Sequence, residues 1–378
     1  MDTIGIICEY NPLHKGHEKQ IRQIRQKNDA GIVCLMSGNF VQRGEPAIVD
    51  KSLRAEAAIR SGADLVLEMP VTASLSSAEG FAEKCVSILS PFCQELSFGA
   101  EHPEQFALMT TAEALLSDAF SPALRQALDT GISFPAARQK ALESMGCSTS
   151  LLTSPNDILA VEYCKAILRC GSKMRPAPIR RMGDYHAEAP DAENPSATSL
   201  RRIMEEGGDV SVFIPQAAIP CFQNAPIHTL QNAERAILAK LRTMTDEEFE
   251  AVPYGSEGLW RKLMHASRQC ATLEELFSAV KSKRYTYTRI SRMVLCAFLG
   301  ITAEQLNTPA PYVRVLAFNE RGRQILKDAR QHGTFLNAGE KVDDPYQQLE
   351  NRCGDLYGLF SSSPEAPGVE GRRRVVSL

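Results

Sequence analysis

Short apolar runs alternate with helical patterns through residues 1–101, and this alternation constrains the fold more than any other feature of the sequence. The apolar runs have the composition of strands that are buried on both faces. They lie at residues 3–10, 30–37, 64–70 and 95–101. Helical patterns separate them at residues 17–28, 52–62 and 77–89. Parallel strands need crossover connections, so this order predicts an α/β fold: a Rossmann-like parallel sheet flanked by helices.

Helical patterns dominate the rest of the chain. Residues 174–182 predict one further strand, and residues 311–319 predict a lone strand or an extended segment. Residues 183–198 are rich in Pro, Asp, Glu and Ala and predict a loop, while a short helix is expected at 199–208.

The length predicts more than one domain, because single cores seldom grow to this size. We expect an α/β domain at residues 1–210 and a mainly helical domain at 211–345. An extension that ends in a flexible tail is expected at 346–378.

Composition narrows the class of protein. The 378 residues are 44% hydrophobic and carry a formal net charge of −3, which is typical of a globular protein and argues against an overall basic nucleic-acid binder. The eleven cysteines are scattered without a C-x-x-C pair, mostly in apolar runs, which indicates buried thiols in a reducing cytoplasm. We expect no signal peptide and no membrane span, since the apolar runs are too short.

The stretch EYNPLHKGHEKQ at residues 9–20 follows the first predicted strand and opens the first predicted helix. In such a sheet ligands bind outside the carboxyl ends of the strands, and a helix N-terminus attracts phosphate. Gly16 would allow close approach to the backbone, and His14 and His17 could donate to phosphate oxygens. The alternatives are a metal site, for which no third ligand is evident, and an ordinary surface turn.

A second candidate motif, NPSATSLRRIM, lies at residues 194–204. Ser196, Thr198 and Ser199 can cap the following helix and present hydroxyl groups to phosphates. Arg201 or Arg202 would add charge opposite a leaving pyrophosphate. Taken alone, the motif also fits an ordinary capped helix. Together with the first motif, it resembles the HxGH nucleotidyltransferase superfamily.

Longer sequence strings resemble one family within this superfamily, the tRNA(Met) cytidine acetate ligases. They follow in order up to about residue 330, and the string at residues 36–70 is far more specific than H-x-G-H. The strings are EYNPLHKGH, MSGNFVQRGEPAIVDKSLRAEAAIRSGADLVLEMP, SAEGFA, SFGAE, SPNDILAVEY, RRMGDYH and YTYTRISRMVLCAFLGI.

The resemblance implies an ATP-dependent ligase. Members activate acetate as acetyl-adenylate and pass the acetyl group to N4 of the wobble cytidine of elongator tRNA(Met), giving N4-acetylcytidine. Carried over by motif, residues 1–210 would form the catalytic domain and residues 211–345 would contact the tRNA. His14 and His17 would stabilise the phosphates during attack, and Mg²⁺ is expected with ATP.

The same resemblance implies a set of ATP-binding residues. The set runs through the first motif and adds three positions from later strings and three from the second motif: Ile7, Cys8, Glu9, Tyr10, Asn11, Pro12, Leu13, His14, Lys15, Gly16, His17, Glu18, Lys19, Gln20, Gly99, Asn156, Arg181, Ser196, Thr198 and Arg201. This chain has Asp157 where the family pattern has a second asparagine. Either Asn156 or Asp157, and either Arg180 or Arg181, is therefore expected to contact ATP.

The segment SGNFVQRGEPAIVDKSLRAE, residues 37–56, should border the same crevice because it follows the second predicted strand. Arg43, Lys51 and Arg54 could face anionic substrate. We favour Lys51 and Arg54, since an (i, i+3) pair on a helix can converge on one ligand, and assign Lys51 a catalytic role. The alternative is surface charge.

Residues 280–293, VKSKRYTYTRISRM, are basic without a single acid. Basic side chains contact phosphates, and Tyr285 and Tyr287 could stack on unpaired bases. The expected tRNA-binding residues are Lys281, Lys283, Arg284, Arg289 and Arg292. The alternative is a solvated helix face whose tyrosines pack on the core.

Two other functions fit part of the sequence. An adenylyltransferase acting on a small phosphorylated substrate would leave the helical domain without a role. A non-catalytic RNA-binding protein that senses nucleotides would not need both histidines. The sequence does not predict the oligomeric state.

Overall fold

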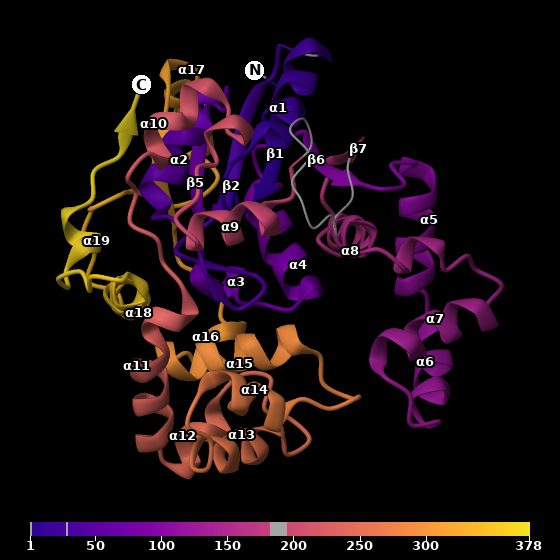
Figure 1. Cartoon of the computed structure of the whole chain (residues 1–378). Coiled ribbons are helices and arrows are strands. Elements are labelled where there is room, and N and C mark those ends of the chain that lie inside the picture. Colours follow the sequence, from indigo (N-terminus) through magenta and orange to yellow (C-terminus); the bar gives the residue numbers. More distant parts are fainter. Residues whose placement is uncertain (1, 28, 182–194) are drawn as a thin grey trace.

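A mostly parallel β-sheet with helices on both faces forms the body of the protein, and a helical unit packs below it in Figure 1. The computed structural model describes residues 2–27, 29–181 and 195–378. Most of the loop predicted at residues 183–198 lies outside these ranges. None of the described helices is long and apolar enough to cross a membrane.

The five predicted strands of the first 182 residues are all present and all pair in parallel, which confirms the predicted α/β fold. They are β1 (Thr3–Cys8), β2 (Gly31–Ser37), β5 (Leu65–Met69), β6 (Glu95–Ala100) and β7 (Arg175–Arg180). Three further strands join them within the described ranges: β8 (Val313–Phe318), β9 (Phe335–Asn337) and β10 (Val376–Ser377). The sheet has the order β10-β8-β5-β2-β1-β6-β7, with β9 also beside β8. A two-stranded hairpin of β3 (Phe40–Val41) and β4 (Glu45–Pro46) follows β2.

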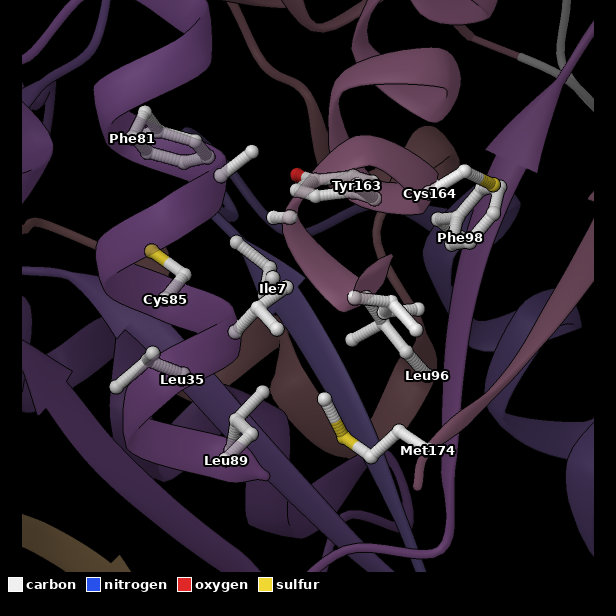
Figure 2. Close-up of a cluster of buried hydrophobic side chains, with 14 of the residues drawn as sticks. Ile7, Leu35, Phe81, Cys85, Leu89, Leu96, Phe98, Tyr163, Cys164 and Met174 are labelled. Atoms are coloured by element: carbon white, nitrogen blue, oxygen red, sulfur yellow. The ribbon is translucent and has the colours of Figure 1, made fainter. Parts of the chain in front are cut away.

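Side chains of successive strand residues point to opposite faces, so the sheet has two cores. One core contains Ile7, Leu35 and Leu67 and is covered by α4 (Ala78–Leu89) and α8 (Pro155–Arg169), as Figure 2 shows for part of it. The other contains Ile6 and Cys34 and is covered by helices, two of which begin in the first and second motifs. These are α1 (Lys15–Lys27), α2 (Lys51–Arg60), α9 (Ala197–Glu205) and α10 (Ile219–Phe222).

A third core belongs to the helical unit. Its helices are α11 (Leu230–Thr243), α12 (Asp246–Ala251), α13 (Leu259–Ser267), α14 (Leu273–Val280), α15 (Tyr287–Leu299) and α16 (Ala303–Asn307). The short α3 (Val71–Ser74) lies between this unit and the sheet, and α5 (Gln105–Leu116), α6 (Phe120–Leu128) and α7 (Phe134–Ser144) extend away from the sheet in Figure 1.

The predicted lone strand at residues 311–319 instead joins the first sheet. Strand β8 (Val313–Phe318) pairs antiparallel with β5, and β9 (Phe335–Asn337) extends its other edge. Helix α17 (Glu320–Ala329) packs against β2 and β5. Part of the segment that we assigned to the helical domain therefore completes the α/β body, a long-range pairing that no local pattern encodes.

The expectation of a flexible tail is wrong for the last residues. Helix α18 (Pro345–Tyr357) packs on α15, and β10 (Val376–Ser377) pairs with β8. Between them, α19 (Val369–Arg372) contacts α18 and carries Glu370, which is 3% exposed. The polar composition of this segment suggested disorder. The prediction failed because its charged side chains have buried partners that the sequence does not reveal.

Candidate functional site

A pocket of about 380 Å³ opens beside β1 and β6, at the starts of α1, α8 and α9. Most of the predicted ATP-binding residues line it: Ile7, Cys8, Glu9, Tyr10, Asn11, His14, Gly16, His17, Lys19, Gln20, Gly99, Asn156, Arg181, Ser196, Thr198 and Arg201. The structure thus brings together residues 7–20, Gly99, Asn156, Arg181 and residues 196–201, at the strand ends where such a sheet binds ligands.

Four residues of the predicted set lie outside the pocket lining. Pro12 and Leu13 are buried, and Leu13 belongs to the core between the sheet and α1. Lys15 is the first residue of α1, and Glu18 pairs with Arg22 one turn further on (2.9 Å). These four residues therefore belong to the turn before α1 and to its first turn, and not to the pocket wall.

The two histidines of the first motif stack on one another, with ring centroids 3.7 Å apart. The Nδ1 of His14 accepts a hydrogen bond from the Gly16 amide (3.1 Å), and the Nδ1 of His17 accepts from the His14 amide (3.3 Å). In a neutral imidazole that accepts at Nδ1, the proton is on Nε2. Both rings are therefore arranged as Nε2–H donors.

His14 Nε2 is buried and has no hydrogen-bond partner among the described residues. A buried donor without a partner costs free energy, so such a group at a pocket wall indicates a ligand-binding role. The preceding turn is also unusual, since Tyr10 adopts a positive φ of 46° that non-glycine residues rarely adopt. A Cβ on Gly16 would lie 3.0 Å from the His14 ring, so this glycine leaves space for the imidazole.

Burial keeps both imidazoles neutral. It lowers the pKa of His14 to about 3, helped by the nearby charge of Arg181. Burial likewise lowers the pKa of His17 well below its usual value, with further contributions from His14 and Arg181. At neutral pH each imidazole is therefore uncharged and can donate one hydrogen bond, from its Nε2–H, to an anion.

The opposite wall resolves the choice between neighbouring residues. Arg181 Nη1 donates to Asn156 Oδ1 (3.0 Å), and Asn156 Nδ2 donates to Glu101 (2.6 Å), so both side chains are held at the pocket. Burial lowers the pKa of Arg181 below its usual value, Glu101 partly offsets this, and Arg43 adds to the lowering. The geometry favours Asn156 and Arg181 as ligand-facing residues.

Their neighbours have structural partners. Asp157 is fully buried, and its Oδ1 accepts from the amides of Glu101 (2.8 Å) and His102 (3.0 Å). Arg180 also lines the pocket, but its side chain is exposed and pairs with Glu104 (3.1 Å). Asp157 therefore holds the chain that leaves β6, which explains why a carboxylate is tolerated where the family pattern has asparagine.

The second motif is linked directly to the first. Ser196 caps α9 by accepting from the Ser199 amide (3.4 Å). Arg201 donates to the Asn11 carbonyl (2.9 Å) and to Thr198 Oγ1 (3.2 Å), whereas Arg202 does not line the pocket. Of the two arginines left open by the sequence, Arg201 is therefore the one placed at the site.

The preference for Lys51 and Arg54 is not supported by their positions. Lys51 Nζ lies 2.5 Å from Glu68 and 2.8 Å from Glu370, and Arg54 is fully buried. Neither residue lines the pocket, but Arg43 does. Lys51, Arg54 and Ala58 lie on the same, buried side of α2. The (i, i+3) spacing therefore reflects contact with the interior of the protein and not a shared ligand.

Sequence reasoning missed several pocket residues. They are mainly apolar side chains from α4, β6 and α8, together with one residue from the hairpin: Phe81, Phe98, Leu159, Tyr163 and Gln42. No short motif marks them, because only the packing of α4 and α8 on the sheet brings them to the pocket.

The basic stretch is only partly exposed. Lys281, Lys283 and Arg284 are exposed, with Arg284 paired to Glu257 (2.7 Å). Arg289 donates to the Tyr254 carbonyl (2.9 Å), and Arg292 donates to the Gln42 carbonyl (3.2 Å).

The tyrosines of this stretch differ. Tyr285 is buried in the helical core, in agreement with the packing alternative, whereas Tyr287 is half exposed beside Phe277.

Comparison with known proteins identifies the family. The family model of the HIGH nucleotidyl transferases matches residues 1–367. A protein of Clostridium novyi named tRNA(Met) cytidine acetate ligase is 38% identical over 387 residues, covering 96% of both chains. One of the same name from Clostridium acetobutylicum is 35% identical over 355 residues, covering 88% of both.

Solved structures agree over the whole chain. The apo structure of Thermotoga maritima TmcAL superposes with a TM-score of 0.92 at 29% identity, and the same protein bound with alpha-thio ATP superposes at 0.89 and 30% identity. Both comparisons cover 100% of each chain. The pocket, the sequence matches and these structures together show that the chain belongs to the tRNA(Met) cytidine acetate ligase family of HIGH nucleotidyl transferases.

Proposed function

We propose that this protein is an ATP-dependent ligase that activates acetate as acetyl-adenylate. It then transfers the acetyl group to N4 of the wobble cytidine of elongator tRNA(Met), forming N4-acetylcytidine. The observation that carries the proposal is the pair of stacked, neutral imidazoles, one with a buried Nε2 that lacks a partner in the described ranges, beside the start of α9. The relatives' shared name and the Thermotoga structure bound with alpha-thio ATP support the choice of substrates.

The first step needs activation because acetate has no adequate leaving group. A carboxylate oxygen attacks the α-phosphorus of ATP, a P–O bond forms, and the bond to pyrophosphate breaks. Donors placed where charge develops stabilise this transition state. His14 and His17 supply Nε2–H groups, while Arg181 and Arg201 supply positive charge and the start of α9 supplies amides.

The second step needs no covalent enzyme intermediate. The N4 amine of cytidine attacks the activated carbonyl carbon, the bond to the AMP oxygen breaks, and the amine loses a proton. The scattered cysteines therefore need no catalytic role. Burial raises the pKa of several thiols, for example Cys164 to about 12, which keeps them protonated and unreactive.

Mg²⁺ is proposed to enter with ATP, because it neutralises triphosphate oxygens and keeps several of its waters. No group of three or more His, Cys, Asp or Glu side chains that could hold a metal ion occurs in the part of the chain that the structure describes. The proposal therefore assigns the ion no protein ligand of its own.

The helical unit is the proposed tRNA-binding region, with Lys281, Lys283 and Arg284 as its exposed cations. Its α15 adjoins the pocket through the hairpin. Arg292 donates to the carbonyl of Gln42, and Gln42 lines the pocket. An RNA held on this unit would thus lie next to the nucleotide. Arg289 and Arg292 already donate to backbone carbonyls, so we expect smaller contributions from them.

The direct test is incubation of the protein with ATP, labelled acetate and unmodified elongator tRNA(Met). We expect label in the tRNA and release of one pyrophosphate per acetyl group. Adenylylation of a small phosphorylated compound without labelled RNA would replace the proposal with an adenylyltransferase. Absence of pyrophosphate release under all conditions would favour a nucleotide-sensing protein instead.

The RNA-binding surface needs its own test. We expect the double variant Lys283→Ala/Arg284→Ala to weaken tRNA binding several-fold at low salt and to reduce its salt dependence, because phosphate contacts release counterions. ATP affinity should not change. Lys327→Ala on α17, far from the helical unit in Figure 1, is the matched control. Unchanged tRNA affinity in the double variant would exclude this surface.

A further inference from the structure

The end of the chain is attached to the body by buried charges. Glu370 in α19 lies 2.8 Å from Lys51 Nζ and 2.7 Å from Arg314 Nη1, and its other oxygen lies 2.9 Å from Arg373 Nε. We call this group the buried ionic cluster: Asp50, Lys51, Glu68, Arg314, Glu350, Glu370 and Arg373. Burying so many charges is costly unless each is matched, so their arrangement must fix the geometry closely.

The cluster holds the first turn of α2. Arg373 binds the carboxylate of Asp50 with two nitrogens (2.7 and 2.6 Å) and also donates to Ser52 Oγ (2.7 Å). Asp50 is the N-cap of α2 and accepts from the Ser52 amide (2.8 Å). The residue that follows the cap, Lys51, is the one bound by Glu370. Both charged residues at the end of the chain thus act on the same helix start.

From that helix, Arg54 reaches the carboxyl ends of two central strands. Its Nη1 donates to the carbonyls of Glu9 (2.6 Å) and Ser37 (3.1 Å), and its Nη2 donates to that of Gly38. Glu9 lines the pocket, and its Oε1 accepts from the amide of Gln42, another pocket residue (3.0 Å). The backbone of α2 also donates from Lys51 to Asn39 Oδ1 (3.0 Å), just before the hairpin.

These contacts form a continuous path from the end of the chain to the pocket. We propose that Glu370 and Arg373 are positioning residues for the nucleotide site, acting through the first turn of α2 and Arg54 on Glu9 and the hairpin that carries Gln42 and Arg43. The inference rests on the proposed use of the pocket for ATP. It gives Glu370 and Arg373 a role in the reaction although they lie outside the pocket lining.

The test compares full-length variants at a temperature well below the unfolding transition of each one. Arg373→Ala is expected to lower kcat/KM for ATP in acetate-dependent pyrophosphate release by about tenfold or more, since small displacements of binding groups are costly. ATP affinity measured by calorimetry should fall with it. Arg373→Lys keeps the charge but not the two-nitrogen contact and should recover part of the loss.

The matched control is Arg372→Ala, because Arg372 is exposed and donates only to the carbonyls of Pro367 and Ala366 in its own segment. It should leave kcat/KM unchanged. The double variant Asp50→Asn/Arg373→Ala should lose less than the product of the two single losses, because both changes remove the same ion pair while the asparagine can still cap α2. If Arg373→Ala does not fold, Asp50→Asn, which can still cap α2, replaces it and should also lower kcat/KM.

Two outcomes would overturn the inference. One is a wild-type kcat/KM in the folded Arg373→Ala or Asp50→Asn protein, even with a lower melting temperature. The other is a double variant whose loss equals the product of the single losses. If the wild-type protein releases no pyrophosphate, the proposed function fails instead, and the ATP affinities of the same variants still decide the positioning role.

Discussion

Two groups of buried polar side chains lie at the same end of the central strands, and they are organised in opposite ways. In the buried ionic cluster, Asp50, Glu68 and Glu370 each have a cation within 2.8 Å. In the pocket, burial keeps His14 and His17 neutral, and His14 Nε2 has no partner in the described ranges. Compensated charge stabilises the fold, whereas an uncompensated donor is held ready for a ligand.

The largest expected effect tests the pocket side of this comparison. His14→Ala and His17→Ala should each lower acetate-dependent pyrophosphate release by about 10²–10³-fold, because each removes a donor aimed at developing charge. The melting temperature should fall less than in variants of the buried ionic cluster, because the lost Nε2 donors do not support the fold and each variant loses one Nδ1 acceptor for a backbone amide. Activity and thermal unfolding are measured on the same samples.

His265→Ala, an exposed position on α13, serves as the control and should retain full activity. Full activity in both pocket variants would remove the histidines from the mechanism. A large fall in melting temperature would instead place them with the residues that hold the fold.

The second prediction tests the cluster. Glu370→Gln removes the carboxylate that Lys51, Arg314 and Arg373 share and leaves each of them with one acidic partner in the cluster. It should lower the free energy of unfolding by about 3 kcal/mol in urea titrations. Burial alone would raise the pKa of Glu370, but these cations lower it to about 2 from its usual 4.5.

The contribution of Glu370 is therefore complete above about pH 4.5 and is lost as the pH falls toward 2. The difference in unfolding free energy between wild type and Glu370→Gln should shrink over that range. A difference that stays constant would mean that the ion pairs contribute nothing to stability.

The contrast between the two regions also explains what the sequence could predict. The buried strands and the placement of His14 and His17 follow from local apolar runs and from the position of a motif between strand and helix. The pocket-lining residues of the second motif follow from an N-cap pattern and the family resemblance. These signals are short-range, and the structure confirms the elements on which they depend.

The errors concern long-range partners. Lys51 and Arg373 are 322 positions apart in numbering yet belong to one cluster, and no pattern in either segment indicates the other. Charge near the predicted crevice suggested ligand contact for Lys51, and charge near the terminus suggested a flexible tail. Only the docking of β8 and β10 on the sheet brings these opposite charges together.

The third prediction separates two adjacent residues of α8. Asn156→Ala should weaken ATP binding by about tenfold, the value of one hydrogen bond to a charged group, without changing stability. Asp157→Ala should lower the free energy of unfolding, since it leaves the amides of Glu101 and His102 without their acceptor. Calorimetry measures ATP binding and denaturant titration measures stability. Weaker ATP binding in Asp157→Ala and lower stability in Asn156→Ala would show that the asparagine pattern of the family does not apply here.

The smallest effect is expected in the pH profile. Because burial lowers the pKa of His14 to about 3, kcat/KM for ATP should show no single-proton fall near the usual histidine value of 6.5. A fall centred there in the wild-type protein would mean that a pocket imidazole is solvated and is charged in mildly acidic solution.

The central claim is that the pocket joins acetate to the α-phosphorus of ATP. Its most direct test uses acetate labelled with heavy oxygen in both carboxylate positions, together with ATP and tRNA, followed by mass spectrometry of the AMP. If the carboxylate attacks phosphorus and the amine then attacks carbon, the AMP must retain an acetate oxygen. We predict labelled AMP in proportion to acetylated tRNA. Unlabelled AMP alongside acetylated tRNA would contradict the account.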